Sequence, residues 1–314
     1  MVFLVAKNTT TCRQLVSLSR LLLLPQQEKS LSTVTQQQLK QISQDDKDEP
    51  EAVLRYLDGK DNGIAVLGLR RPTARNALGK RLLKELYDAL DNLQKDDKVR
   101  ALIVRSLVPG VFCSGADLKE RARMEPTEVA GHVDKLRELM RRFAEAKPPV
   151  IAALDGLALG GGLELALASD IRTASEEAKM GLVETKLAII PGAGGTQRLP
   201  RIIGEAKAKE LIFTARTVDG LEAHKIGLVN SVVPQNKQGD AAYQRALHIA
   251  REILPNGPIA VRLAKEAIAK GIEAPIGDGY EIEKQCYAQL LNTEDRIEGL
   301  AAFAAKRVPV YRGL

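Results

Sequence analysis

The sequence predicts an α/β fold with parallel strands, because apolar runs of strand length alternate with amphipathic helical segments. Residues 63–69, 99–106 and 150–154 are such runs, and a helical pattern separates each run from the next. Strands that are joined through helices pair in parallel, since a short turn cannot connect the ends of two parallel strands. This pattern, seen before residue 175, argues for an α/β body rather than a helical bundle.

The first strand is followed by a turn over residues 70–78 and then by a helix. Leucines in this helix recur at a spacing that places them on one face, which should pack on the sheet; they are Leu82, Leu86, Leu90 and Leu93.

From Ala206 onward the pattern is largely helical. Helices are expected over residues 241–254, 259–270 and 281–291, with breaks at Pro255–Pro258 and Pro275–Gly279. We assign residues 53–250 to the α/β core and residues 251–314 to a helical C-terminal region of the kind that forms a lid or a subunit interface.

The N-terminus has the composition of a targeting segment. Residues 1–27 contain Lys7, Arg13 and Arg20, no acidic residue, and several threonines and serines. A secretory signal is the alternative, but Arg20 interrupts the apolar stretch and the run that follows it is short. We therefore predict a mitochondrial transit peptide over residues 1–30, a polar linker over residues 31–52, and a location in the mitochondrial matrix.

Composition excludes several classes of protein. Apolar residues make up 45% and charged residues 27% of the 314-residue chain, and no run is long enough to cross a bilayer, so no membrane association is expected. Three isolated cysteines (Cys12, Cys113, Cys286) and three isolated histidines (His132, His224, His248) give neither a disulfide framework nor the spacing of a metal site. We expect no metal.

Two glutamates are the main candidates for chemistry. Glu164 follows Gly160–Gly162 at the start of a predicted helix, and Glu184 precedes a segment that contains Pro191–Gly195. An apolar environment raises the pKa of the Glu164 carboxyl, whereas a helix N-terminus favours its ionised form. The residue is thus either a general base or a glutamate that only stabilises its helix.

Backbone N–H groups beside these glutamates could stabilise an oxyanion. Consecutive glycines at Gly160–Gly162 leave N–H groups open to a ligand; close packing of a helix on a strand is the alternative explanation. Asp117 should cap the next helix, which would direct the N–H of Ala116 into the same site.

Three segments together resemble the enoyl-CoA hydratase (crotonase) family. They are Cys113–Leu118, Asp155–Glu164, and Gly181–Glu184 with the following Ile190–Leu199. The resemblance implies a crotonase-like spiral of ββα units with a helical C-terminal trimerisation region, assembled as a trimer or a dimer of trimers. It also implies an acyl-CoA substrate and no cofactor beyond the CoA that the substrate carries.

The same resemblance implies the roles of individual residues. Ala116 and Gly161 form the oxyanion hole for the thioester oxygen, Glu164 deprotonates the attacking water, and Glu184 delivers a proton to C2. CoA is expected to lie along Arg75, Phe112, Ser114, Gly115 and Ala116, with its phosphates near Lys306. The presence of both glutamates favours hydration over isomerisation or thioester hydrolysis.

Within the family, Asp117–Met124 and Lys179–Ile190 resemble the branch that hydrates 3-methylglutaconyl-CoA in leucine breakdown. The second carboxylate of that substrate would meet Lys119, Arg121 or Arg123, unless these residues form only an exposed charged helix face. A generic short-chain enoyl-CoA hydratase of fatty-acid oxidation is the alternative.

A family member that binds AU-rich RNA or is not catalytic is a further alternative, from another class of function. Residues 80–100 contain six basic and five acidic residues, a net charge of +1, and aromatic residues make up 4% of the chain. Phosphate contacts need a concentrated positive surface and base stacking needs aromatic rings, so the sequence argues against RNA binding.

Overall fold

A computed structural model describes residues 49–314. The transit peptide predicted over residues 1–30 lies outside the described residues, and so does the linker predicted over residues 31–52, except for its last four positions. Within the described part of the chain, no helix is both long and apolar enough to cross a membrane.

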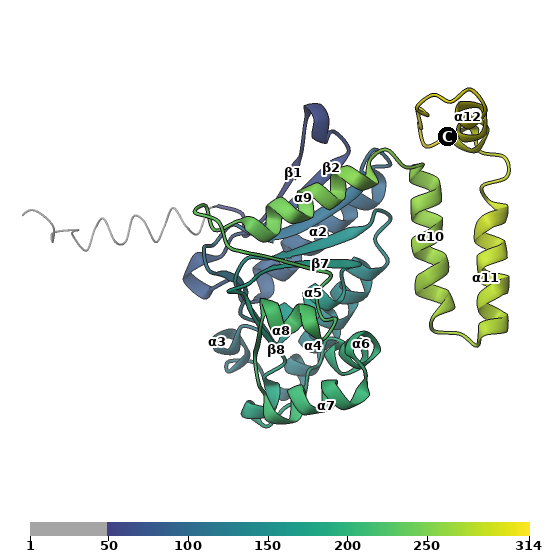
Figure 1. Cartoon of the computed structure of the whole chain (residues 1–314). Coiled ribbons are helices and arrows are strands. Elements are labelled where there is room, and N and C mark those ends of the chain that lie inside the picture. The colour runs from purple at the N-terminus through teal and green to yellow at the C-terminus, as the bar shows by residue number, and fades with distance from the viewer. Residues whose placement is uncertain (1–48) are drawn as a thin grey trace, which may run out of the picture. The chain divides into compact units, whose positions relative to one another are not determined.

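Two β-sheets form the centre of the fold (Figure 1). The six-stranded sheet has the order β1 (Ala52–Tyr56), β2 (Ile64–Leu69), β3 (Ala101–Ser106), β5 (Val150–Leu154), β7 (Ile171–Ser175) and β10 (Ser231–Val233). In this sheet only β1 is antiparallel to its neighbour, so the predicted parallel pairing is confirmed. The four-stranded sheet has the order β4 (Val111–Cys113), β6 (Leu157–Leu159), β8 (Lys179–Gly181) and β9 (Val218–Asp219).

Helices connect and cover these strands. They are α2 (Lys80–Lys95), α3 (Leu118–Arg121), α4 (Pro126–Ala144), α5 (Gly161–Leu167), α6 (Gly195–Ile203), α7 (Glu205–Thr214), α8 (Gly220–Lys225) and α9 (Ala241–Ile253), with short 3-10 helices η1 (Gly59–Asp61), η2 (Pro72–Ala74) and η3 (Glu184–Leu187). The four leucines predicted to share a face of α2 are all buried, which confirms that this face packs inward.

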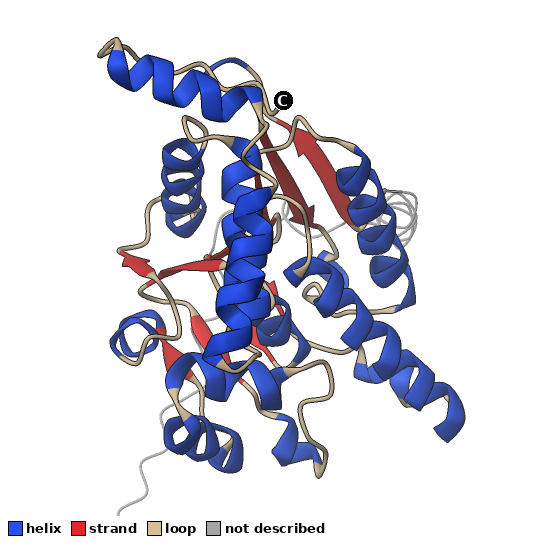
Figure 2. Cartoon of the chain, turned by 90° about the vertical axis from the view of Figure 1, so that its right-hand side faces the viewer, coloured by secondary structure: helices blue, strands red, loops and turns tan. Residues whose placement is uncertain are grey.

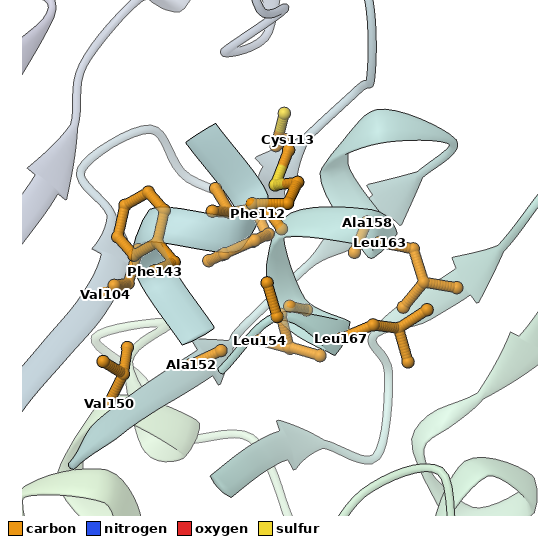
Figure 3. Packing of buried hydrophobic residues seen from close by; sticks show 14 of the residues in the cluster. Val104, Phe112, Cys113, Phe143, Val150, Ala152, Leu154, Ala158, Leu163 and Leu167 are labelled. Carbon is orange, nitrogen blue, oxygen red and sulfur yellow. The ribbon is translucent and has the colours of Figure 1, made fainter. Parts of the chain in front are cut away.

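Alternate residues of β2 supply two cores. Leu67 and Leu69 belong to the larger core with α2, α4 and α5, whereas Ile64 and Val66 belong to a smaller core with α9. This division follows from the two-residue period of a strand that is buried on both faces. Figure 3 shows part of the larger core, including Phe112.

Three helices make up the C-terminal region: α10 (Pro258–Gly271), α11 (Ile276–Ala288) and α12 (Glu294–Ala304). Figure 2 views the molecule from their side, and α10 and α11 lie next to each other in Figure 1. The chain does break between α10 and α11, at residues 272–275, but the predicted break at Pro275–Gly279 extends too far, because α11 already begins at Ile276. A β-carbon on Gly279 would lie 3.5 Å from the carbonyl oxygen of Gly271, an ordinary van der Waals distance, so α10 and α11 are in contact at this point.

Asn76 joins the loop that precedes α2 to β3 and β4. Its side chain is fully buried, with Nδ2 donating to Ser106 Oγ (2.8 Å) and to the Phe112 carbonyl (2.9 Å), while Oδ1 accepts from the Arg71 amide (2.7 Å). Its φ of 55° lies in the left-handed region, which asparagine tolerates better than most residues.

Substitution Asn76→Ala should therefore destabilise the fold. Loss of three hydrogen bonds around a buried position is expected to lower the free energy of unfolding by about 3 kcal/mol, measured by urea denaturation. Asn62→Ala, at an exposed position, is the matched control and should change stability by less than about 0.5 kcal/mol. Equal stability of the two variants would contradict the structural role of Asn76.

Candidate active site

A cavity of about 770 Å³ collects most of the predicted site residues. Its wall is formed by the loop before α3, by α4, by the N-terminus of α5, and by the chain from η3 to α6. Ser114, Gly115, Ala116, Gly161, Glu164 and Glu184 all line it.

The two predicted oxyanion donors are neighbours in this cavity. Within the described chain, the N–H groups of Ala116 and Gly161 have no hydrogen-bond acceptor. A β-carbon on Gly161 would lie 3.5 Å from the Ala116 nitrogen, so the two amides sit side by side. Asp117 caps α3 by accepting from the amides of Lys119 and Glu120 (both 3.0 Å), which confirms the predicted cap. Two free N–H groups this close can bind one oxygen.

Glycines make this proximity possible. A β-carbon on Gly162 would lie only 2.2 Å from the Cys113 carbonyl oxygen, so any other residue would push α5 away from β4. Gly115 has a φ of 99°, and a β-carbon there would lie 2.8 Å from the Leu159 carbonyl oxygen. Both positions thus require glycine for steric reasons.

Glu164 lies on α5 with its carboxyl held by backbone donors. Oε1 accepts from the amides of Ala193 and Gly195, each at 2.8 Å. Burial raises the pKa of this carboxyl above its usual value, while the two amides act in the opposite direction by stabilising the ionised form.

Glu184 is the first residue of η3, and its carboxyl reaches the glycine turn before α5. A β-carbon on Gly160 would lie 3.1 Å from Glu184 Oε1, and Oε2 is buried without a partner among the described residues. Burial, and then the nearby charge of Glu164, raise the pKa of Glu184 to about 7. The two carboxyls therefore differ: two amides stabilise the ionised form of Glu164, whereas Glu184 titrates near neutral pH.

Comparison with known proteins agrees with this arrangement. The sequence model of the enoyl-CoA hydratase/isomerase family matches residues 59–313. The chain belongs to the enoyl-CoA hydratase/isomerase family. Its fold is accordingly the crotonase fold, as the sequence predicted.

Relatives of similar identity to this chain carry different names. The mitochondrial methylglutaconyl-CoA hydratase of Mus musculus is 58% identical over 267 residues, which cover 85% of each chain. The mitochondrial enoyl-CoA hydratase domain-containing protein 2 of Homo sapiens is 56% identical over 263 residues, covering 84% of this chain and 90% of that protein. The crystal structure of enoyl-CoA hydratase from Bacillus anthracis superposes with a TM-score of 0.80 at 45% identity, covering 84% of this chain and all of that one.

Of the residues predicted to contact CoA, three line the cavity, and Arg75, Phe112 and Lys306 do not. Ser114, Gly115 and Ala116 line the cavity, and Ser114 is tied to the exposed Arg75 through its amide (3.1 Å to the Arg75 carbonyl). The Phe112 ring is 1% exposed in the core, so it does not reach the cavity. Lys306 follows α12 and is exposed, also away from the cavity lining.

Sequence reasoning missed the donors to Glu164 and one cation of the cavity wall. The amides of Ala193 and Gly195 hold the carboxylate, and the glycine-rich run after Pro191 was the signal that could have indicated them. Arg137 of α4 also lines the cavity; a helical face that is otherwise polar gave no signal for it. Of the three basic residues considered for a substrate carboxylate, Arg121 lines the cavity, whereas Lys119 and Arg123 do not.

The raised pKa of Glu184 predicts a pH-dependent stability. Between the carboxyl's ordinary value of 4.5 and about 7, the folded protein keeps a proton that the unfolded chain releases, so this group lowers stability as pH rises through that window. Glu184→Gln should remove this cost and raise the free energy of unfolding by about 1–2 kcal/mol at pH 8, with a smaller gain at pH 5.

Denaturation of the two proteins at both pH values measures this difference. Glu177→Gln, at an exposed position, is the control and should leave the pH dependence of stability as in the unsubstituted protein. A gain from Glu184→Gln that is equal at pH 5 and pH 8 would contradict the prediction.

Proposed function

We propose that this protein is an enoyl-CoA hydratase, a hydro-lyase that adds water across the 2,3 double bond of an acyl-CoA. The observation that carries the proposal is one cavity in which two unoccupied N–H groups, of Ala116 and Gly161, adjoin two carboxyls with raised pKa. Membership of the enoyl-CoA hydratase/isomerase family supports it.

In the proposed mechanism, the thioester oxygen accepts hydrogen bonds from the Ala116 and Gly161 amides. These bonds withdraw electrons from the double bond and make C3 electrophilic. Glu164, held as a carboxylate by Ala193 and Gly195, takes a proton from water while the water oxygen bonds to C3. The electron pair of the double bond moves towards the thioester oxygen, whose developing charge the two amides stabilise.

Glu184 completes the addition. Its pKa of about 7 leaves a large fraction of the carboxyl protonated at neutral pH, and this form can deliver a proton to C2 as the thioester carbonyl re-forms. Exchange of protons with water then returns both carboxyls to their starting states. These steps need neither a metal nor a cofactor.

For the substrate, we favour 3-methylglutaconyl-CoA, which would give 3-hydroxy-3-methylglutaryl-CoA in leucine breakdown. Relatives at 57–58% identity that carry the name methylglutaconyl-CoA hydratase support this choice. Relatives with the name enoyl-CoA hydratase domain-containing protein 2 are 55–56% identical, so a generic short-chain enoyl-CoA is the second candidate. The mitochondrial relatives also support the proposed mitochondrial matrix location and transit peptide.

We further propose a trimer or a dimer of trimers, formed through α10–α12. Exposed apolar residues on these helices and after them support an interface; they include Ile268, Ile272, Tyr280, Phe303 and Val308. Lys306 would lie at this interface region, and its contact with CoA phosphates is part of the same proposal.

Removal of either carboxyl should stop the chemistry without abolishing binding. Glu164→Gln and Glu184→Gln are each expected to lower kcat by at least about a hundredfold in a crotonyl-CoA hydration assay, while the Kd for CoA changes little. Glu176→Gln, outside the cavity, is the control. Near-normal turnover by either active-site variant would remove that residue from the mechanism.

A direct comparison of substrates separates the two candidate activities. The mature chain should hydrate 3-methylglutaconyl-CoA with a kcat/KM at least about tenfold higher than that for crotonyl-CoA, because a site built for a charged acyl group gains binding energy from it. Equal or faster turnover of crotonyl-CoA would favour the generic hydratase.

A further inference from the structure

We propose that Arg121, supported by Arg137, receives a carboxylate at the far end of the acyl group and selects acidic enoyl-CoA substrates. The inference rests on the proposed hydratase function and assigns the charge selection to one guanidinium. It distinguishes Arg121 from the other basic residues on the same segment.

Arg121 is placed for this role by the short helix α3. It is the last residue of α3, and the cap of that helix, Asp117, directly follows the oxyanion donor Ala116. Arg121 lies four positions after Asp117, a rise of about 6 Å along the helix. Because Ala116 and Arg121 line the same cavity, the far end of a short acyl group whose thioester oxygen lies at Ala116 would be within reach of the guanidinium.

The guanidinium of Arg121 is free to bind a ligand. The residue is half-buried, and its side chain has no hydrogen bond or ion pair within residues 49–314. Nearby acidic residues already have partners: Glu120 pairs with Arg71, and Glu128 pairs with Lys80. A partly desolvated guanidinium without an anion is a ready partner for a ligand carboxylate, which it can bind through two parallel hydrogen bonds.

Arg137 adds a second positive charge to the same wall. It lies on α4, lines the cavity, and is paired with the exposed Asp134 at 2.7 Å. Its charge acts on Glu164, so it lies within electrostatic range of the reacting end as well. Because Arg137 already has a partner, we assign it a supporting role.

Apolar side chains make up much of the cavity wall. Leu118, Val133, Leu136 and Leu187 line it and suit the carbon chain of an acyl group. A cavity that holds cations, apolar side chains and oxyanion donors suits a short dicarboxylic monothioester. Lys119 and Arg123 carry the same charge but do not line the cavity.

The test compares an acidic with an uncharged substrate in the full mature protein. Arg121→Met removes the charge and retains a long flexible side chain, and Arg121→Lys retains the charge without the paired hydrogen bonds. For 3-methylglutaconyl-CoA, Arg121→Met should lower kcat/KM by about thirtyfold or more and Arg121→Lys by less, while kcat/KM for trans-2-hexenoyl-CoA stays within about threefold. Arg123→Gln should change neither substrate by more than about twofold.

Each outcome supports or overturns a separate statement. An equal loss for both substrates, together with a weaker Kd for free CoA, would show that Arg121 binds the CoA moiety and would overturn the proposal while leaving the hydratase function intact. An unchanged preference in Arg121→Met would overturn it as well. Absence of hydration of either substrate by the unsubstituted protein would instead refute the proposed function.

Discussion

The active site depends on the close contact between Gly162 and the carbonyl of Cys113. Because no side chain separates them, the N-terminus of α5 rests directly on β4, and the amide of Gly161 lies beside that of Ala116. Glu164 is on the same helix, so the contact that aligns the two N–H donors also fixes the carboxylate. The oxyanion donors and the proposed base are thus placed by one steric constraint, which any β-carbon at Gly162 would break.

The two carboxyls differ because their surroundings differ. Glu164 is almost completely buried, yet two backbone amides bind its oxygen and stabilise the charge. Glu184 has a buried oxygen without a donor and a pKa of about 7. An anion and a neutral acid can therefore coexist beside one substrate near neutral pH, which is the condition for removing a proton from water and supplying another to carbon. Arg121 and Arg137 extend the same cavity with the opposite charge.

The sequence predicted the features that depend on local pattern. Strand β5, the buried leucines of α2 and the cap at Asp117 follow from periodicity and capping rules, and both glutamates were found through their glycine motifs. Features that depend on contacts between distant elements could not be predicted. The sequence around Gly279 predicts a helix break, whereas this residue lies within α11 and faces Gly271. Phe112 adjoins the oxyanion loop in sequence, but its ring turns into the core. The cavity positions of Arg121 and Arg137 depend on the tertiary structure that brings α3 and α4 to one cavity.

The most direct test of this account is the infrared stretch of the thioester carbonyl of crotonyl-CoA bound to the Glu184→Gln variant. If the Ala116 and Gly161 amides both bind the carbonyl oxygen, the stretch should shift to lower wavenumber than in water. Adding Gly162→Ala, which displaces α5 from β4, should reverse the shift. A carbonyl stretch that equals the solution value in the variant with Gly162 intact would contradict the account.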